Sequence, residues 1–114
     1  VNNHIGDPGA EALGQALQSK SCSLRTLDLR VNQIGDSGAR ALGQALKSKS
    51  CPLRELKLRG NSVKDEGAMA FVEALKYNSE LCTLDLGDCV GNDARQVLFE
   101  TARAHPKEVE LQFC

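Results

Sequence analysis

Residues 3–31, NHIGDPGAEALGQALQSKSCSLRTLDLRV, and residues 32–60, NQIGDSGARALGQALKSKSCPLRELKLRG, decide the fold because they are identical at 21 of 29 positions. Residues 61–88, NSVKDEGAMAFVEALKYNSELCTLDLGD, form the same unit one residue shorter, and a divergent fourth unit, degenerate or capping, covers 89–114. Repeats of this length are typical of units that bury their apolar faces by stacking on one another. Because no linker separates them, residues 1–114 are predicted to form a single domain of about three and a half repeats.

Each unit begins with a segment of helical periodicity. Ala39, Leu42 and Leu46 recur at i, i+3 and i+7, which places them on one face of a helix. An aspartate stands directly before each of the first three helical segments, and we expect it to cap the N-terminus of that helix. These aspartates are Asp7, Asp36 and Asp65.

Each unit then changes to the alternation of a short strand, with leucines such as Leu56 and Leu58 on one side. An asparagine follows three residues after the last leucine, where a buried amide can both donate to and accept from the backbone. Stacked one per unit, these amides are predicted to form a ladder of Asn3, Asn32 and Asn61. The whole pattern predicts an α/β solenoid with a parallel sheet on its concave face and helices on its convex face.

The repeat also resembles a known family. The pattern L-x-x-L-x-L-x-x-N, followed by x-I/V-x-D-x-G-A and a helix, is similar to the ribonuclease-inhibitor-type leucine-rich repeat over essentially the whole chain. The phrase Cys22-Ser23-Leu24 is similar to that family's 29-residue form, and 77–81 (YNSEL) to the 28-residue form found in NOD-like receptors. The resemblance implies a right-handed βα horseshoe. The fourth unit departs from the pattern, because Cys89 replaces the ladder asparagine and Gly91 replaces Ile or Val.

The composition excludes several classes of partner. The chain of 114 residues carries 14 Lys and Arg against 15 Asp and Glu, which gives a net charge of −1. This balance offers no basic surface for nucleic acid or for an anionic membrane. The longest apolar run, 68–72, is too short to span a bilayer. We therefore expect no nucleic-acid partner and no membrane partner.

The five cysteines bear on the compartment. An odd number without a regular framework favours a reducing environment, and we expect a cytoplasmic protein. Cys22 and Cys51 occupy the same repeat position, so their thiols should be neighbours, and buried free thiols are favoured there over a disulfide. Cys89 is expected to be buried in the same way. Cys82 is expected to be partly exposed, and Cys114 to oxidise most readily.

No pattern of catalytic or metal-binding residues emerges. The cysteine spacings include no C-x-x-C, and no histidine lies nearby in the sequence to complete a zinc site. His4 and His105 share no repeat position and are expected to face solvent in loops. We therefore predict no catalytic residue, no cofactor and no metal.

The exposed side of the strands is the surface that solenoids offer to partners. Alternation places Asp28, Lys57 and Asp85 in one column, which alternates in sign and is expected to neutralise itself. The next column stacks Arg30 on Arg59 without an acid, so we expect these arginines to bind an acidic group on a partner. The alternative is that both are solvated edge charges inherited by duplication. The candidate partner-binding residues are Arg30, Arg59, Lys57, Glu55, Asp28 and Asp85.

The function predicted first is a non-catalytic protein–protein interaction module. Since the chain starts at Val1 within a repeat, we expect a fragment of a longer leucine-rich-repeat protein, such as the sensing end of a NOD-like receptor of innate immunity. The alternatives are an enzyme inhibitor like ribonuclease inhibitor, a GTPase regulator like the Ran GTPase-activating proteins, and a structural spacer in a large assembly. An exposed leucine layer in the first unit would also allow end-to-end self-association.

Overall fold

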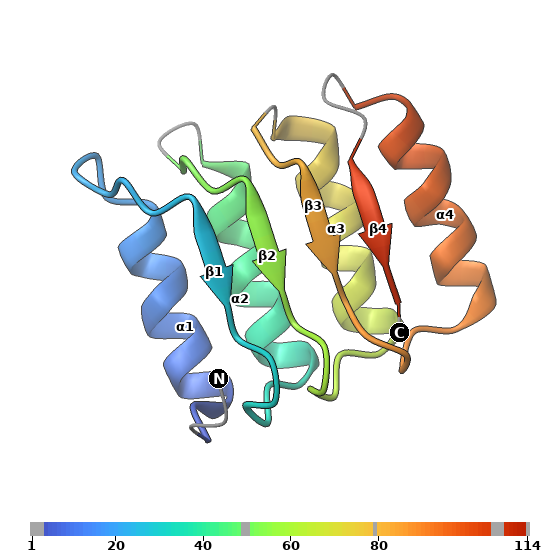
Figure 1. Cartoon of the computed structure of the whole chain (residues 1–114), viewed down its shortest axis with the longest axis horizontal. Helices are drawn as coiled ribbons and strands as arrows, with labels where there is room; N and C mark the ends of the chain where they lie inside the picture. Colours follow the sequence, from blue (N-terminus) through green and yellow to red (C-terminus); the bar gives the residue numbers. More distant parts are fainter. Residues whose placement is uncertain (1–3, 49–50, 79, 106–108, 114) are drawn as a thin grey trace.

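Four helix–strand units follow one another side by side in the computed structural model of the chain (Figure 1). The structure describes residues 4–48, 51–78, 80–105 and 109–113. The elements are α1 (Gly6–Leu17), β1 (Thr26–Asp28), α2 (Asp36–Lys47), β2 (Glu55–Lys57), α3 (Asp65–Tyr77), β3 (Thr83–Asp85), α4 (Asn92–Arg103) and β4 (Glu110–Gln112).

The four strands form one parallel sheet in the order β1-β2-β3-β4. Their registers align one leucine per strand, so that Leu27, Leu56, Leu84 and Leu111 lie next to each other across the sheet. All four helices cover the same side of the sheet and leave the other side open (Figure 1). We call that open side the strand face. The predicted α/β repeat solenoid is confirmed.

The core lies between the sheet and the helices. In the second unit the predicted helix face is fully covered, since Ala39, Leu42 and Leu46 are at most 1% exposed. The leucines of its strand segment, Leu56 and Leu58, are 0% exposed. Burial of an aliphatic side chain contributes roughly 1.5–3 kcal/mol, so these stacked layers are the main source of stability.

Glycines allow neighbouring helices to approach closely. A Cβ atom on Gly43 would lie 3.1 Å from the backbone oxygen of Ala70 in α3, and one on Gly14 would lie 3.0 Å from that of Ala41 in α2. Both distances are tighter than an ordinary carbon–oxygen contact. A side chain at either glycine would therefore push two units apart.

The predicted aspartate caps act between units rather than within them, so the prediction that each caps its own helix is wrong. Asp7 Oδ1 accepts hydrogen bonds from the backbone N–H groups of Gly35 and Gly38, at 2.8 and 2.9 Å. Asp36 Oδ1 accepts from Lys64 and Gly67 in the same way, at 2.7 and 3.0 Å. The third acceptor is Asp65 Oδ1, which binds the N–H of Gly91 at 2.6 Å.

The aspartates bind the following unit because the helices lie side by side. Each aspartate is at or near the start of its helix, and its carboxylate reaches sideways to the N-terminus of the following helix, where free N–H groups favour a negative charge. The same contact explains why position 38 is occupied by glycine, because a Cβ on Gly38 would lie only 2.6 Å from Asp7 Oδ1. We call this set of contacts the aspartate relay.

The asparagine ladder is confirmed at the positions that the structure describes. Asn61 Oδ1 accepts from the N–H groups of Asn32 and Ile34, at 2.9 and 2.8 Å. Its Nδ2 donates to the carbonyl oxygens of Leu29 and Leu58. The side chain of Asn61 therefore links two units through their backbones. Asn3 lies outside the described residues.

Candidate functional site

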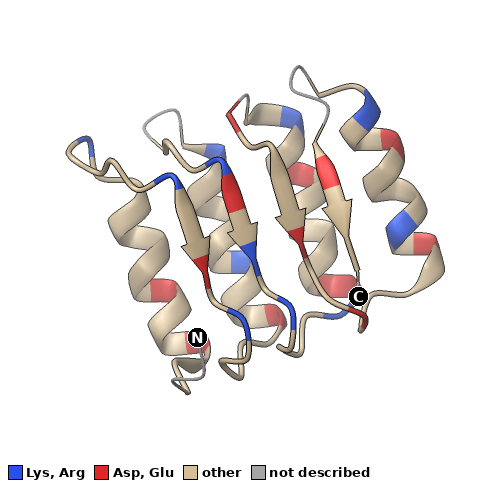
Figure 2. Ribbon diagram, in the orientation of Figure 1, with Lys and Arg blue, Asp and Glu red and all other residues tan. Residues whose placement is uncertain are grey.

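Charged residues of both signs occur along the strands and the turns that follow them (Figure 2). The registers place Thr26 beside Glu55, and Asp28 beside Lys57. Thr26 Oγ1 donates to Glu55 Oε1 at 3.1 Å, which joins the first two strands at the surface. Of the candidate residues named from the sequence, Asp28, Glu55 and Lys57 therefore lie next to each other on the first two strands, whereas Asp85 is buried.

Arg30 is paired with the aspartate two residues before it. Its Nε donates to Asp28 Oδ1 at 2.9 Å and its Nη2 to Asp28 Oδ2 at 2.7 Å, a bidentate contact. The backbone N–H of Arg30 also donates to Asp28 Oδ1. The arginine side chain is 42% exposed and that of the aspartate 29%, so the pair lies at the surface.

This contact controls the acidity of Asp28. The hydrogen bonds from the Arg30 side chain lower the pKa of the carboxyl from 3.8 to about 2, and Lys57 on the neighbouring strand adds to the same direction. A carboxylate held by a guanidinium is stabilised in its charged form. Asp28 therefore stays ionised throughout the physiological range.

Arg59 reaches across to the next strand instead. Its Nη2 lies 3.1 Å from Asp85 Oδ2, and the carboxylate also accepts from the N–H of Gly87 at 3.2 Å. The Asp85 side chain is only 3% exposed, whereas that of Arg59 is 45% exposed. One partner of this pair is therefore buried and the other faces solvent.

These contacts correct two expectations about the strand face. Both arginines have a carboxylate partner, so the expectation that Arg30 and Arg59 stack without an acid is wrong. The aspartates of the middle column pair with those arginines rather than with Lys57, among the ion pairs of the described residues. The two arginines differ because Arg59 has Asp85 on the next strand, whereas the corresponding place beside Arg30 holds Lys57.

The cysteines follow the expectations only in part. Cys22, Cys51, Cys82 and Cys89 are free thiols. Cys51 is buried as expected, and burial raises its pKa, with Cys22 adding to the rise, whereas Cys22 itself is only partly buried, so the expectation of a buried thiol is wrong there. Cys82 is partly buried, as expected. Cys89 is exposed, so the expectation of a buried thiol is wrong there, and its Sγ makes long contacts of 3.9 Å to the Asn61 carbonyl oxygen and to Asp88 Oδ1. Cys114 lies outside the described residues.

The histidines do not both face solvent. His4 is exposed, but His105 is 4% exposed, so the expectation for it is wrong. It lies two residues after the end of α4, where its N–H donates to the carbonyl oxygen of Ala102. In the described part of the chain, His, Cys, Asp and Glu side chains form no group that could hold a metal ion.

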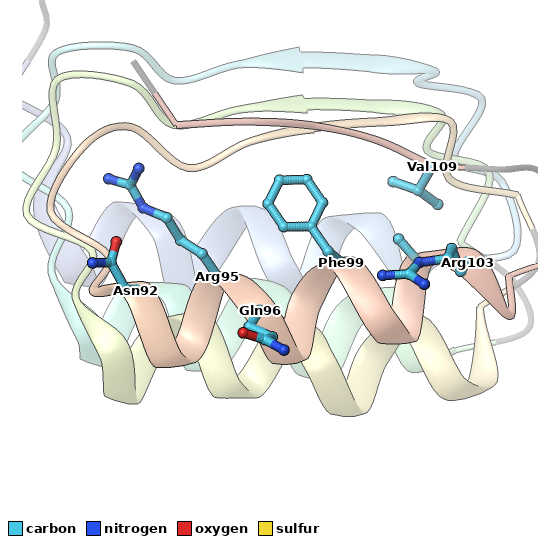
Figure 3. Close-up of a pocket in the computed structure, with 7 residues that line it drawn as sticks. Asn92, Arg95, Gln96, Phe99, Arg103 and Val109 are labelled. Carbon is cyan, nitrogen blue, oxygen red and sulfur yellow. The ribbon is translucent and has the colours of Figure 1, made fainter.

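Sequence reasoning missed a groove beside the last helix. It has a volume of about 650 Å³ and lies between the outer face of α4 and the residue before β4 (Figure 3). The expectation that Gly91 replaces Ile or Val is wrong, because the buried Val90 fills that place and the N–H of Gly91 binds Asp65 as that of Lys64 binds Asp36. With the fourth unit aligned in this way, the sequence does carry a signal, since Arg95 and Phe99 occupy the places of Ala39 and Gly43. The lining residues are Asn92, Arg95, Gln96, Phe99, Ala102, Arg103 and Val109.

Stacked strand–helix units with an asparagine ladder and an open sheet define a βα-repeat solenoid. The chain belongs to the leucine-rich repeat family, since the family described as Leucine Rich repeat matches residues 1–14, 20–43 and 49–72, more than half of its length. No curated protein matches the sequence.

One similar solved structure is described as "Leiomodin-1 Actin-Binding Site 2 (ABS2)". The TM-score is 0.84 at 18% sequence identity, and the match covers 99% of this chain and 66% of that chain. At this identity the likeness shows a shared fold. In the described residues, no helix has the length and apolar character needed to cross a membrane.

Proposed function

We propose that the domain is a non-catalytic protein-interaction module that binds a protein partner through the strand face. The observation that carries the proposal is the pair of arginines whose guanidinium groups are held by carboxylates while more than 40% of each side chain stays exposed. A guanidinium has five N–H donors, and Asp28 uses only two of those of Arg30. The others are available to a partner.

Holding the arginines in place favours binding. A long side chain that is already fixed loses less conformational entropy when a partner docks, about 0.5–1.5 kcal/mol for each such side chain. Glu55 and Lys57 lie beside the arginines on the same face. The mixed charge selects a partner with complementary acidic and basic groups rather than a uniformly charged one.

The experiment uses a charge reversal at the surface, and circular dichroism checks that the variant is folded. Arg30→Glu changes an exposed pair, whereas a change at Arg59 would leave the buried Asp85 carboxylate without its cation. Arg25→Glu is the matched control, because Arg25 is exposed, precedes β1 and carries the same charge. Wild type and both variants are compared by affinity purification from reducing cytosol, followed by direct titration of each captured protein.

We expect Arg30→Glu to weaken binding by at least about tenfold while Arg25→Glu leaves it unchanged. Equal capture by all three proteins would show that the arginines are solvated edge charges, and the spacer alternative would then lead. Purified actin is the first defined partner to titrate, because the similar leiomodin-1 structure is described as an actin-binding site.

The cellular role and compartment are proposed from the repeat pattern. The similarity of 77–81 to the repeats of NOD-like receptors supports innate immune sensing in the cytoplasm. Inhibition of a basic enzyme, as in ribonuclease inhibitor, finds less support, because the strand face described above is mixed in charge. We also propose that isolated copies associate through the first unit, where Leu24 is 43% exposed. Sedimentation velocity of wild type and Leu24→Lys at several concentrations tests this association.

A further inference from the structure

The outer face of α4 differs from the corresponding face of the other helices. In α2, the residues that face α3 are small: a Cβ on Gly67 would lie 2.9 Å from the Ala39 Cβ, and a Cβ on Gly43 would lie 3.1 Å from the oxygen of Ala70. This spacing leaves room only for alanine and glycine. The contact between α1 and α2 is built in the same way, with Gly14 against Ala41.

Large side chains occupy these places in the last helix. Counted from the first residue of each helix, Arg95 corresponds to Ala39 and Phe99 to Gly43. A helix spaced like α2 and α3 would collide with both. The face is therefore built for something other than another unit packed at that distance.

The two side chains are held in place rather than free. The Phe99 ring meets the Phe113 ring edge-on, with centroids 5.6 Å apart. The Arg95 guanidinium lies 4.9 Å from the centroid of Phe113, and its Nε donates to the carbonyl oxygen of Val90 at 2.8 Å. Phe99 nevertheless remains 46% exposed. The groove thus has a fixed aromatic floor that is open to solvent.

The groove is cationic. Figure 3 shows Arg95, Phe99 and Arg103 in succession along α4, with the aromatic ring between the two arginines. Among the described residues that line the groove there is no carboxylate, and none of the ion pairs in that part of the chain involves either arginine. Glu100, which is on the same helix, accepts a hydrogen bond of 3.4 Å from Gln96. An apolar centre flanked by two positive charges is thus the chemical character of this surface.

We propose that the groove binds an acidic peptide segment of a protein partner, with an apolar side chain on Phe99 and carboxylates on Arg95 and Arg103. A helix face that offers anchors at i, i+4 and i+8 matches a short helical or extended segment of this kind. Arginine pairs with carboxylates more strongly than lysine because its N–H groups form bidentate contacts. The proposal is independent of the strand face, which lies on the other side of the sheet from the helices.

The experiment screens the whole chain against a random peptide library displayed on phage. We expect the enriched peptides to carry Asp or Glu on both sides of a Leu, Ile or aromatic residue. The best peptide is then synthesised and titrated by fluorescence anisotropy against wild type, Arg103→Glu, Phe99→Ala and the control Arg25→Glu. Amide chemical shifts locate the site, and circular dichroism checks that each variant is folded.

The expected result is a loss of affinity of about tenfold or more in Arg103→Glu, with Arg25→Glu unchanged, and shift changes concentrated on α4 and Val109. Affinity should also fall as salt is raised, because exposed charges are screened. An absence of enriched peptides, enrichment of neutral or basic ones, or shift changes on the strand face would each overturn the proposal. Equal binding by a folded Arg103→Glu variant would overturn it as well.

Discussion

The first and last units close the two ends of the core in different ways. The first unit shares most of its sequence with the second, yet Leu24 is 43% exposed, whereas its counterpart Leu53 is 0% exposed. In the last unit, Phe99 and Phe113 pack edge-on over the end of the core. Burial in a stacked fold is therefore set by the neighbouring unit as much as by the unit's own residues.

The largest expected effect tests this comparison directly with the same substitution at equivalent positions. Leu53→Ala should lower the free energy of unfolding by about 3 kcal/mol, because it leaves a cavity in a filled layer. Leu24→Ala should cost less than about 1 kcal/mol, because water already reaches this side chain. Urea unfolding of the two variants measures the difference. Equal losses would show that sequence, rather than position in the stack, sets the contribution.

The two arginine–aspartate pairs extend the comparison to the strand face. Arg59→Ala should cost about 1–3 kcal/mol, because the Asp85 carboxylate is buried and would lose its charged partner. Arg30→Ala should lower the free energy of unfolding clearly less, because water can hydrate the partly exposed Asp28 carboxylate. Thermal unfolding in parallel ranks the two variants. A larger loss for Arg30→Ala would contradict the role given to burial.

Within the aspartate relay, the contact between the second and third units can be compared with the contact between the third and fourth. Asp36→Ala removes the acceptor for two N–H groups and should cost about 1 kcal/mol, the typical value of a helix cap. Asp65→Ala removes one such bond in the described residues and should cost less. Asn at each position is the matched control, since it retains an acceptor. Chemical denaturation resolves the order.

The smallest effect concerns pH in the first unit. The pKa of Asp28 is lowered to about 2, so its contact with Arg30 stabilises the folded state at any pH above the ordinary value of 3.8 and is lost as the pH falls toward 2. In Arg30→Ala we expect the carboxyl to titrate nearer 3.8. Side-chain NMR titration of both proteins measures this. An unchanged midpoint would mean that Arg30 does not hold the carboxylate in solution.

The sequence predicted the solenoid well because its signals are periodic. The leucine spacing defines which side of each strand is buried, and the ladder position of Asn61 follows from its place after the strand. Because the first two units are nearly identical, their alignment also predicts which residues lie opposite each other in neighbouring strands. Chain-internal periodicity thus contains most of the information about this architecture.

Contacts between units were harder to predict. Asp36 looks like a cap for its own helix, and only the lateral offset between helices shows that it serves the next one. Arg59 similarly finds Asp85 on another strand, a choice that depends on which residue occupies the neighbouring column. The groove beside α4 depends on three-dimensional packing at the end of the stack. Periodicity describes one unit, and these features belong to pairs of units.

The aspartate relay gives the stack a direction. Each carboxylate comes from the earlier unit and each N–H from the later one. Peeling units from the N-terminal side therefore strips a helix of its acceptor at every step, whereas peeling from the C-terminal side only returns a carboxylate to water. The free-energy cost of unfolding therefore differs between the two ends of the domain. Hydrogen exchange of the amides at the start of a helix should report whether the preceding unit is folded.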